Sequence, residues 1–402
     1  MTFREEALER FRQTGLPSKK SEAYKYSPIS GALKNIDLTG DARSNEVPII
    51  DGLPERLFHT EGHHIVFVNG NFSRELSSDY RQIPFEAGNL TETFLRQHCK
   101  YNEDPFALLN HSSFRSGFLF KTGPGQQVEA PVIITHLFSG NGGPIQSHVK
   151  NVFVVQKNSS IQVVENFVAL DNVEVFDTTS LHCTVEEGAS MEHYITHTEK
   201  NTNQIHVGFS NVVQKKDSRY RNVTVSLDGK MIRNNLYVNL EAEGCHTDLY
   251  GLYTPTGKNH IDNYTTVDHR IANSSSNELY KGIIDDQASG VFNGRIFVRP
   301  DAQNTNAFQS NKNILLTENV TVHAKPQLEI WADDVKCSHG CTSGQLDDAS
   351  LFYLCARGLN KQQARALLLK AFTSEVINEI NIVPLRERLD KILETKLLKD
   401  VY

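Results

Sequence analysis

More than 200 consecutive residues of this chain show strand-like patterns and no helical period. Between residues 106 and 335, short apolar or alternating runs are separated by Asn, Asp, Gly and Ser. Val223, Val225 and Leu227 form one such run, with the two-residue spacing of a half-buried strand. The strands of a doubly wound α/β domain are separated by helices, so this pattern excludes that fold. A β-sandwich, a β-barrel and a β-solenoid remain.

The length of the strand-rich region favours a solenoid, whereas the lack of a clear sequence repeat argues against one. A solenoid lengthens by adding coils without outgrowing one core, which suits the length of the strand-rich region. A solenoid also leads us to expect a regular repeat, and the sequence shows no crisp period. The pattern alone therefore leaves a sandwich and a solenoid open.

The two ends of the chain have helical patterns. Segment 1–30 begins with a predicted helix, for which Thr2 and Glu5 form a capping box. After Gly358, apolar residues recur with a period of 3.6 in two stretches separated by Pro384. We therefore divide the chain into a mixed helical region (1–105), a strand-rich core (106–342) and a C-terminal helical region (343–402).

Composition limits the possible functions. The chain has 402 residues, a net charge of −7 and no basic run, so we do not expect nucleic acid as a partner. No apolar stretch approaches the roughly 18 residues of a membrane span, and the charged N-terminus lacks the apolar part of a secretory signal. Six cysteines in a chain of this length do not predict a disulfide framework. We expect no membrane span and a reducing, cytoplasmic setting.

Segment 336–341 combines two thiols and an imidazole. It reads Lys-Cys-Ser-His-Gly-Cys and lies between a strand-like run and a helix-like run. Residues two apart in an extended segment share a face, so Cys337, His339 and Cys341 would point the same way. Such a set suits zinc, iron or an iron–sulfur cluster. Structural zinc usually needs four protein ligands and no second pair follows, so buried thiols beside a hydrogen-bonded histidine remain an alternative.

Motifs of common enzyme classes are missing from the sequence. Segment 251–259 does not have the glycine spacing of a phosphate-binding loop, and Asn259 stands where Ser or Thr would hold magnesium. The chain has neither a nucleophile elbow nor a zinc-protease helix. A β-helical enzyme acting on polysaccharide would need paired carboxylates on a groove, and no convincing pair is found.

Four segments of the C-terminal half stand out together: 279–282 (Leu-Tyr-Lys-Gly), 291–295 (Val-Phe-Asn-Gly-Arg), 325–330 (Lys-Pro-Gln-Leu-Glu-Ile) and 334–340 (Asp-Val-Lys-Cys-Ser-His-Gly). In this order they resemble the SufB/SufD family of iron–sulfur cluster assembly proteins. Near the N-terminus, segment 67–70 (Phe-Val-Asn-Gly) is also similar to that family. The resemblance spans nearly the whole chain.

Two positions distinguish branches of the family. The SufB branch usually has glutamate after the motif histidine, where this chain has Gly340, so the chain is more similar to the SufD branch. That branch commonly has alanine where this chain has Cys341. We therefore leave Cys341 out of the predicted metal ligands.

This resemblance implies a mainly β fold with helical flanks, in which a right-handed parallel β-helix forms the core. It implies a non-catalytic scaffold that pairs with a SufB-like subunit and docks a SufC-like ATPase. An iron–sulfur cluster would be built at the interface of the B and D subunits. The cluster would be transient and belong to the complex, so the isolated chain, expected to form a homodimer, would hold no tightly bound cofactor.

The resemblance also assigns roles to residues. His339 would be a candidate cluster ligand at the subunit interface, with Cys337 beside it. The SufC-like ATPase would dock on the C-terminal helix through an apolar stripe that comprises Leu367, Leu368, Ala371, Phe372 and Val376. The stripe also permits the simpler interpretation that it packs on the sheet domain. Two rival functions stay open, a polysaccharide-acting β-helical enzyme and a protein with a structural zinc site.

Overall fold

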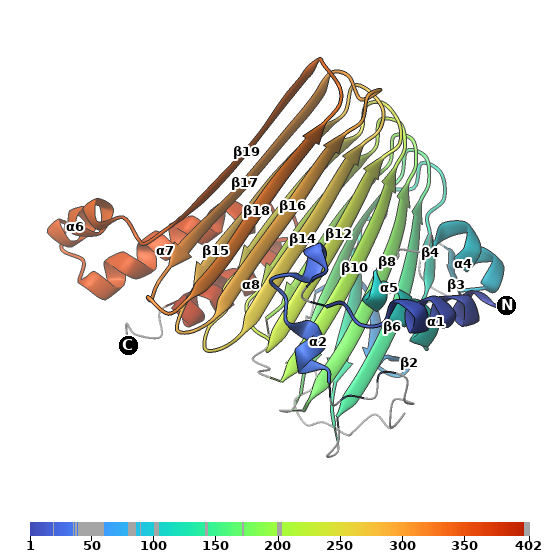
Figure 1. Ribbon diagram of the computed structural model, residues 1–402, viewed down its shortest axis with the longest axis horizontal. Coiled ribbons are helices and arrows are strands. Elements are labelled where there is room, and N and C mark those ends of the chain that lie inside the picture. The colour runs from blue at the N-terminus through green and yellow to red at the C-terminus, as the bar shows by residue number, and fades with distance from the viewer. Residues whose placement is uncertain are drawn as a thin grey trace.

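The computed structural model describes residues 1–18, 20–34, 36, 38, 60–78, 86–88, 90–99, 104–140, 144–170, 173–198 and 203–397. These residues form two long β-sheets that face each other, with helices at both ends (Figure 1). From β4 onward, strands alternate between the two sheets, and from β6 onward each pairs in parallel with the strand two before it in the chain. This arrangement is a parallel β-helix, so the solenoid is confirmed and the sandwich is excluded.

The first sheet, here called sheet A, contains β1 (His63–Val68), β2 (Asn71–Ser73), β5 (Val132–Phe138), β7 (Ser160–Ala169), β9 (Ser190–His197), β11 (Arg219–Ser226), β13 (His246–Tyr253), β15 (Ser275–Ile284), β17 (Thr305–Leu315) and β19 (Val335–Gly344). Sheet B contains β3 (Glu86–Gly88), β4 (Leu119–Lys121), β6 (Ile145–Val155), β8 (Val175–Val185), β10 (Gln204–Gln214), β12 (Met231–Leu240), β14 (His260–His269), β16 (Ser289–Val298) and β18 (Thr321–Ile330). The helices are α1 (Phe3–Thr14), the short 3₁₀ helix η1 (Glu22–Tyr24), α2 (Ile29–Ala32), α4 (Glu92–His98), α5 (Pro105–Ser113), α6 (Asp348–Ala356), α7 (Lys361–Ile377) and α8 (Val383–Leu397). Within the described ranges, none of these helices combines the length and the apolar character that crossing a membrane requires.

The coils of the β-helix differ in length. The stretch of chain from Ile205 to its partner Met231 in the next coil is shorter than the stretch from Val291 to its partner His323. Several corners turn on Asn or Asp residues with positive φ, of which Asp217 is one, because these side chains tolerate the left-handed conformation. The unequal coils explain why the sequence shows no crisp period.

The N-terminal end of the β-helix is closed by two short antiparallel strands. β2 pairs antiparallel with β1 at the end of sheet A, and β3 pairs antiparallel with β4 at the end of sheet B. β1 itself pairs in parallel with β5. The β-helix therefore extends to the N-terminal side of the predicted strand-rich core, as far as residue 63.

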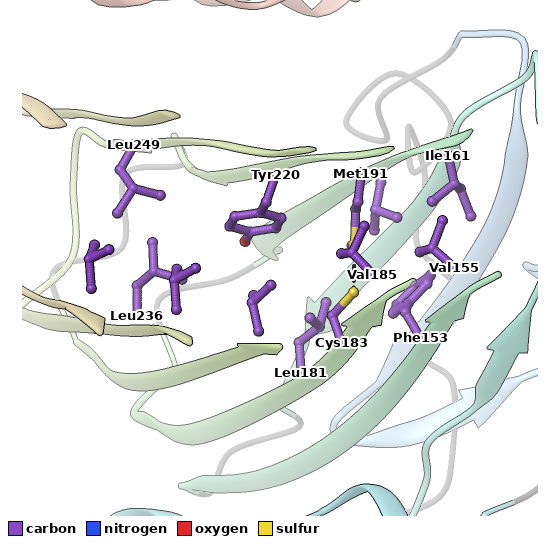
Figure 2. Close-up of a cluster of buried hydrophobic side chains, with 14 of the residues drawn as sticks. Phe153, Val155, Ile161, Leu181, Cys183, Val185, Met191, Tyr220, Leu236 and Leu249 are labelled. Atoms are coloured by element: carbon purple, nitrogen blue, oxygen red, sulfur yellow. Dashed lines mark hydrogen bonds between the residues drawn. The ribbon is translucent and has the colours of Figure 1, made fainter. Parts of the chain in front are cut away.

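An apolar core fills the space between the two sheets. Figure 2 shows Phe153 and Leu181 of sheet B pointing toward Met191 and Tyr220 of sheet A. Cys183 lies in the same cluster, with its Sγ atom 3.1 Å from Sδ of Met191. All six cysteines are free thiols, as the cysteine count predicts.

Different ends of the chain cover the outer faces of the two sheets. Leu385, Leu389 and Leu393 of α8 recur at four-residue spacing and pack with Val223 and Leu252 on the outer face of sheet A. The α1–α5 region covers sheet B in the same way (Figure 1). The capping box predicted for the first helix is present, because Thr2 and Glu5 each accept a hydrogen bond from the other's backbone N–H.

Buried charge and ring stacking fasten the N-terminal segment to sheet B. Arg233, which is 1% exposed, forms an ion pair with Asp262 of the next coil. The same guanidinium lies 4.0 Å from the ring centre of Tyr24. Farther along the segment, Tyr26 stacks on His323 of β18 with ring centres 4.0 Å apart. The start of the chain therefore reaches the last strand of sheet B.

The leucine contacts of α8 generate a stability prediction. Leu389→Ala removes a side chain that is 1% exposed and leaves a cavity, so the free energy of unfolding should fall by about 2–5 kcal/mol. Leu367→Ala is the control, because Leu367 is 47% exposed and its loss should change little. Urea unfolding of both variants checks this, and equal midpoints would contradict the packing of α8 on sheet A.

Candidate functional site

The thiol–imidazole motif lies on β19, the last strand of sheet A. β19 pairs with β17 on one side and is the final strand in the order of its sheet. β18 is likewise the final strand of sheet B. This end of the β-helix, seen at the upper left of Figure 1, is therefore open, unlike the N-terminal end.

One face of β19 points into the β-helix. Val335 and Cys337 pack against the apolar core between the sheets. Because alternate residues of a strand share a face, His339 and Cys341 belong to the same inward face. No further coil covers that face among the described residues, so His339 and Cys341 are exposed and Cys337 is half-buried. The predicted shared face of the three side chains agrees with this strand geometry.

The two thiols of the motif favour the neutral form. Partial burial raises the pKa of Cys337 and also that of Cys341, because the thiolate loses hydration. The thiolate is the form that ligates metal, so either sulfur would have to lose its proton on binding. Among the described residues, no group of three His, Cys, Asp or Glu side chains is arranged to hold a metal ion. The three motif side chains lie along one strand and do not form a metal-binding group by themselves.

Beneath His339, the interior of the β-helix is polar. The register of sheet A stacks Leu249, Glu278, Gln309 and His339 in one inward column across four strands. Gln309 Nε2 donates to Oε1 of Glu278 at 3.2 Å, and Thr265 Oγ1 donates to Oε2 of Glu278 at 2.7 Å. A carboxylate that is 3% exposed thus lies two coils below the open end.

A second polar column lies beside the first. Cys341 stacks on Asn311, with 3.8 Å between Sγ and the side-chain oxygen. Asn311 Nδ2 and Asn313 Oδ1 both hydrogen-bond the hydroxyl of Tyr253, at 3.1 and 2.5 Å. The Tyr253 ring needs the absence of a side chain at Gly282, where a Cβ atom would lie 2.6 Å from the ring. The Cys341 thiol is therefore connected through Asn311 to the buried polar side chains of the interior.

These interior residues do not follow from the sequence motif. Glu278, Gln309 and His339 lie on three successive coils, and only the coil register brings them together. The sequence signal for these residues would be polar residues that recur at intervals of one coil length. That signal is readable only when the length of each coil is known.

The five predicted docking residues of α7 differ in their exposure to solvent. Leu367 is 47% exposed and Ala371 is also exposed, whereas Leu368 and Phe372 are half-buried. Val376 is 0% exposed and packs with the core that α7 and α8 form on sheet A. Val376 therefore stabilises the fold and is not available for docking a partner.

Exposed aromatic side chains extend the accessible part of this helical region. Phe352 and Tyr353 of α6 are 76% and 58% exposed, and no described residue of α6 is buried. A groove of about 320 Å³ between α7 and α8 is lined by Leu367 and Lys370 among others. We call Phe352, Tyr353 and Leu367 the α6–α7 surface, and its two aromatic residues were not among those predicted.

Glu278 gives the stability of the chain a specific pH dependence. Burial raises the pKa of Glu278 to about 7, while hydrogen bonds from Thr265 and Gln309 act in the opposite direction. The unfolded carboxyl has a pKa of about 4.3, so the folded chain binds more protons between these values and its stability falls as the pH rises from 4.3 to 7. Tyr280, the nearest titrating neighbour, stays neutral here because burial raises its pKa well above the usual value.

Glu278→Gln should therefore gain stability relative to the original chain as the pH rises. Between pH 5 and pH 8 the difference in the free energy of unfolding should grow by about 2.5 kcal/mol, because the amide carries no charge. Its oxygen can accept from Gln309, and its NH2 group can donate to the Thr265 hydroxyl, which reverses the direction of that hydrogen bond. Denaturant unfolding at both pH values measures this. A difference that does not change with pH would show that Glu278 has an ordinary pKa.

Comparisons with known proteins identify the family of this chain. Residues 138–372 match the family described as "SUF system FeS cluster assembly, SufBD core domain". The iron–sulfur cluster assembly protein SufD of Escherichia coli is 27% identical, over 95% of this chain and 89% of its own length. SufD of Bacillus subtilis is 27% identical over 76% and 69%, and protein ABCI7, chloroplastic, of Arabidopsis thaliana is 30% identical over 97% and 84%. The chain therefore belongs to the SufBD family of iron–sulfur cluster assembly proteins and is a homologue of SufD.

Proposed function

We propose that this chain is a non-catalytic scaffold subunit on which an iron–sulfur cluster is assembled together with a second, SufB-like subunit. The observation that carries the proposal is the row of Cys337, His339 and Cys341 on the last strand of an open β-helix, in which His339 and Cys341 are exposed and Cys337 is half-buried. A thiol and an imidazole are suitable iron ligands, but one strand supplies only part of a coordination sphere. A facing subunit would supply the remaining ligands, and the cluster is the product that leaves.

The open end is also suited to pairing with another β-helix. β18 and β19 present unpaired backbone N–H and C=O groups along their outer edges. Exposed edges of this kind pair readily with another strand. A SufB-like subunit would cover them in the complex, and two copies of this chain would form an isologous homodimer through the same edges in isolation.

We assign the docking of a SufC-like ATPase to the α6–α7 surface. Phe352, Tyr353 and Leu367 are exposed apolar side chains on two adjacent helices, and exposed aromatic residues of this kind are typical of protein interfaces. A reducing compartment, such as the cytoplasm, would suit six free cysteines. A structural zinc site, one of the two rival functions, gains no support, because the described residues hold no group of three or more His, Cys, Asp or Glu side chains that could bind a metal ion.

The cluster proposal predicts an order of effects within the motif. His339→Ala should leave the fold and the complex intact, because the side chain is exposed, yet reduce iron and acid-labile sulfide per complex by about tenfold or more. Cys337→Ala should have a milder effect and Cys341→Ala the mildest. The measurement uses complexes with SufB-like and SufC-like subunits, purified without oxygen.

Ser338→Ala is the matched control for this series. Ser338 lies on the same strand but on the opposite face from the three motif residues, so its iron and sulfide should equal those of the original complex. A His339→Ala complex with the original iron and sulfide content would remove the proposal, and the motif would then be structural.

The docking proposal predicts that Leu367→Asp abolishes binding of the SufC-like ATPase without unfolding the chain. Leu367 is 47% exposed in the isolated chain, so the charge stays hydrated until the partner binds. Burying it there would cost about 3 kcal/mol, or roughly 100-fold in affinity. Gln362→Glu adds the same charge elsewhere on α7 and is the control. Calorimetric titration that finds equal affinities for the two variants would place the docking site elsewhere.

A further inference from the structure

Gln309 has an unused hydrogen-bond acceptor directly below the proposed cluster site. The side chain is 3% exposed, and its Oε1 atom has no hydrogen-bond partner within the described part of the chain. The register places Gln309 on β17 next to His339 on β19, both on the inward face. A buried carbonyl oxygen without a donor is unfavourable, so its position beside an exposed imidazole calls for an explanation.

The orientation of the Gln309 amide is determined by its neighbours. Its Nε2 atom donates to Oε1 of Glu278, whose other oxygen accepts a hydrogen bond from Thr265. Glu278 therefore holds the amide nitrogen and leaves the amide oxygen available. Gly294 of β16 makes room for this arrangement, because a Cβ atom there would lie 2.3 Å from Gln309 Nε2.

We infer that Gln309 is a positioning residue for His339, accepting an N–H of the imidazole when a partner subunit covers the open end. In the isolated chain this bond is not made, since His339 is exposed and the acceptor is unpartnered. Once made, it would fix the tautomer and turn the other, unprotonated ring nitrogen toward the partner. The inference rests on the proposed function of His339 as a ligand and adds Gln309 and Glu278 behind it.

The central test is Gln309→Met in the complex purified without oxygen. Methionine has a similar length but no acceptor oxygen, so a role limited to filling space predicts that the variant keeps its iron and sulfide. Loss of the acceptor instead predicts about 10- to 100-fold less iron and acid-labile sulfide per complex. Gln309→Glu keeps an acceptor oxygen in place, shares a proton with Glu278, and should restore most of the content. Ser310→Ala, on the opposite face of β17, is the control.

A spectroscopic measurement separates positioning from folding. Pulsed electron paramagnetic resonance of the reduced complex should detect nitrogen coupling from a coordinated imidazole, and Gln309→Met should weaken or remove that coupling in whatever cluster remains. Gly294→Ala provides a second route, because it displaces the Gln309 amide without changing its chemistry, and it should reproduce the loss.

The outcomes distinguish this inference from the proposed function. If His339→Ala lacks the cluster while Gln309→Met and Gly294→Ala keep the original iron, sulfide and nitrogen coupling, the positioning role is overturned and the proposed function stands. If His339→Ala itself retains the cluster, both are overturned. Loss in Gln309→Met that Gln309→Glu repairs supports the inference.

Discussion

Backbone hydrogen bonding between successive coils is the interaction on which the rest of this structure depends. Each strand satisfies its N–H and C=O groups by pairing with the strands one coil before and one coil after it. Such a ladder has no natural end, so the terminal strands must be covered or left open. The chain covers the N-terminal end with the antiparallel strands β2 and β3 and leaves β18 and β19 open. The proposed site lies at the open end because only there can a second chain complete it.

The helical segments at the two ends of the chain cover the outer faces of the sheets and not their edges. Helices α7 and α8 cover the outer face of sheet A, and the N-terminal region covers that of sheet B. The parts of both faces that these segments cover are apolar and buried, which suits parallel strands. The contact between Tyr26 and His323 shows that the N-terminal segment extends to the strand that bounds the open end.

Local features of the sequence predicted local structure well. The predicted capping box Thr2–Glu5 begins α1, because it depends on residues only three apart. A second capping box, Asn360–Gln363, begins α7. The coil architecture was harder, since coils of unequal length hide their period, and the resemblance to a known family was needed to choose between sandwich and solenoid. The apolar stripe of α7 predicted a helix but not which side is buried, because apolar residues surround that helix and Val376 faces the core.

At the candidate site, too, local features were predictable and features that depend on the coil register were not. The row formed by Cys337, His339 and Cys341 is visible in a single strand and was predicted from its spacing. Gln309 and Glu278, which lie below His339 in the same column, come from two earlier coils, and no spacing rule within one strand could reveal them. Residues that contact a site directly were therefore predictable, and those that orient it required the register.

The closed N-terminal end has a consequence for assembly on a larger scale. Solenoids with two open ends can stack head to tail, and such heterologous contacts propagate into filaments. Here the strands β2 and β3 run against the direction of the coils at one end, so a copy arriving there finds no continuing parallel ladder among the described residues. Among these residues, a parallel ladder can continue only from β18 and β19. A pair joined through those two strands, as proposed above, would have no parallel end left to extend, which would oppose the growth of fibres.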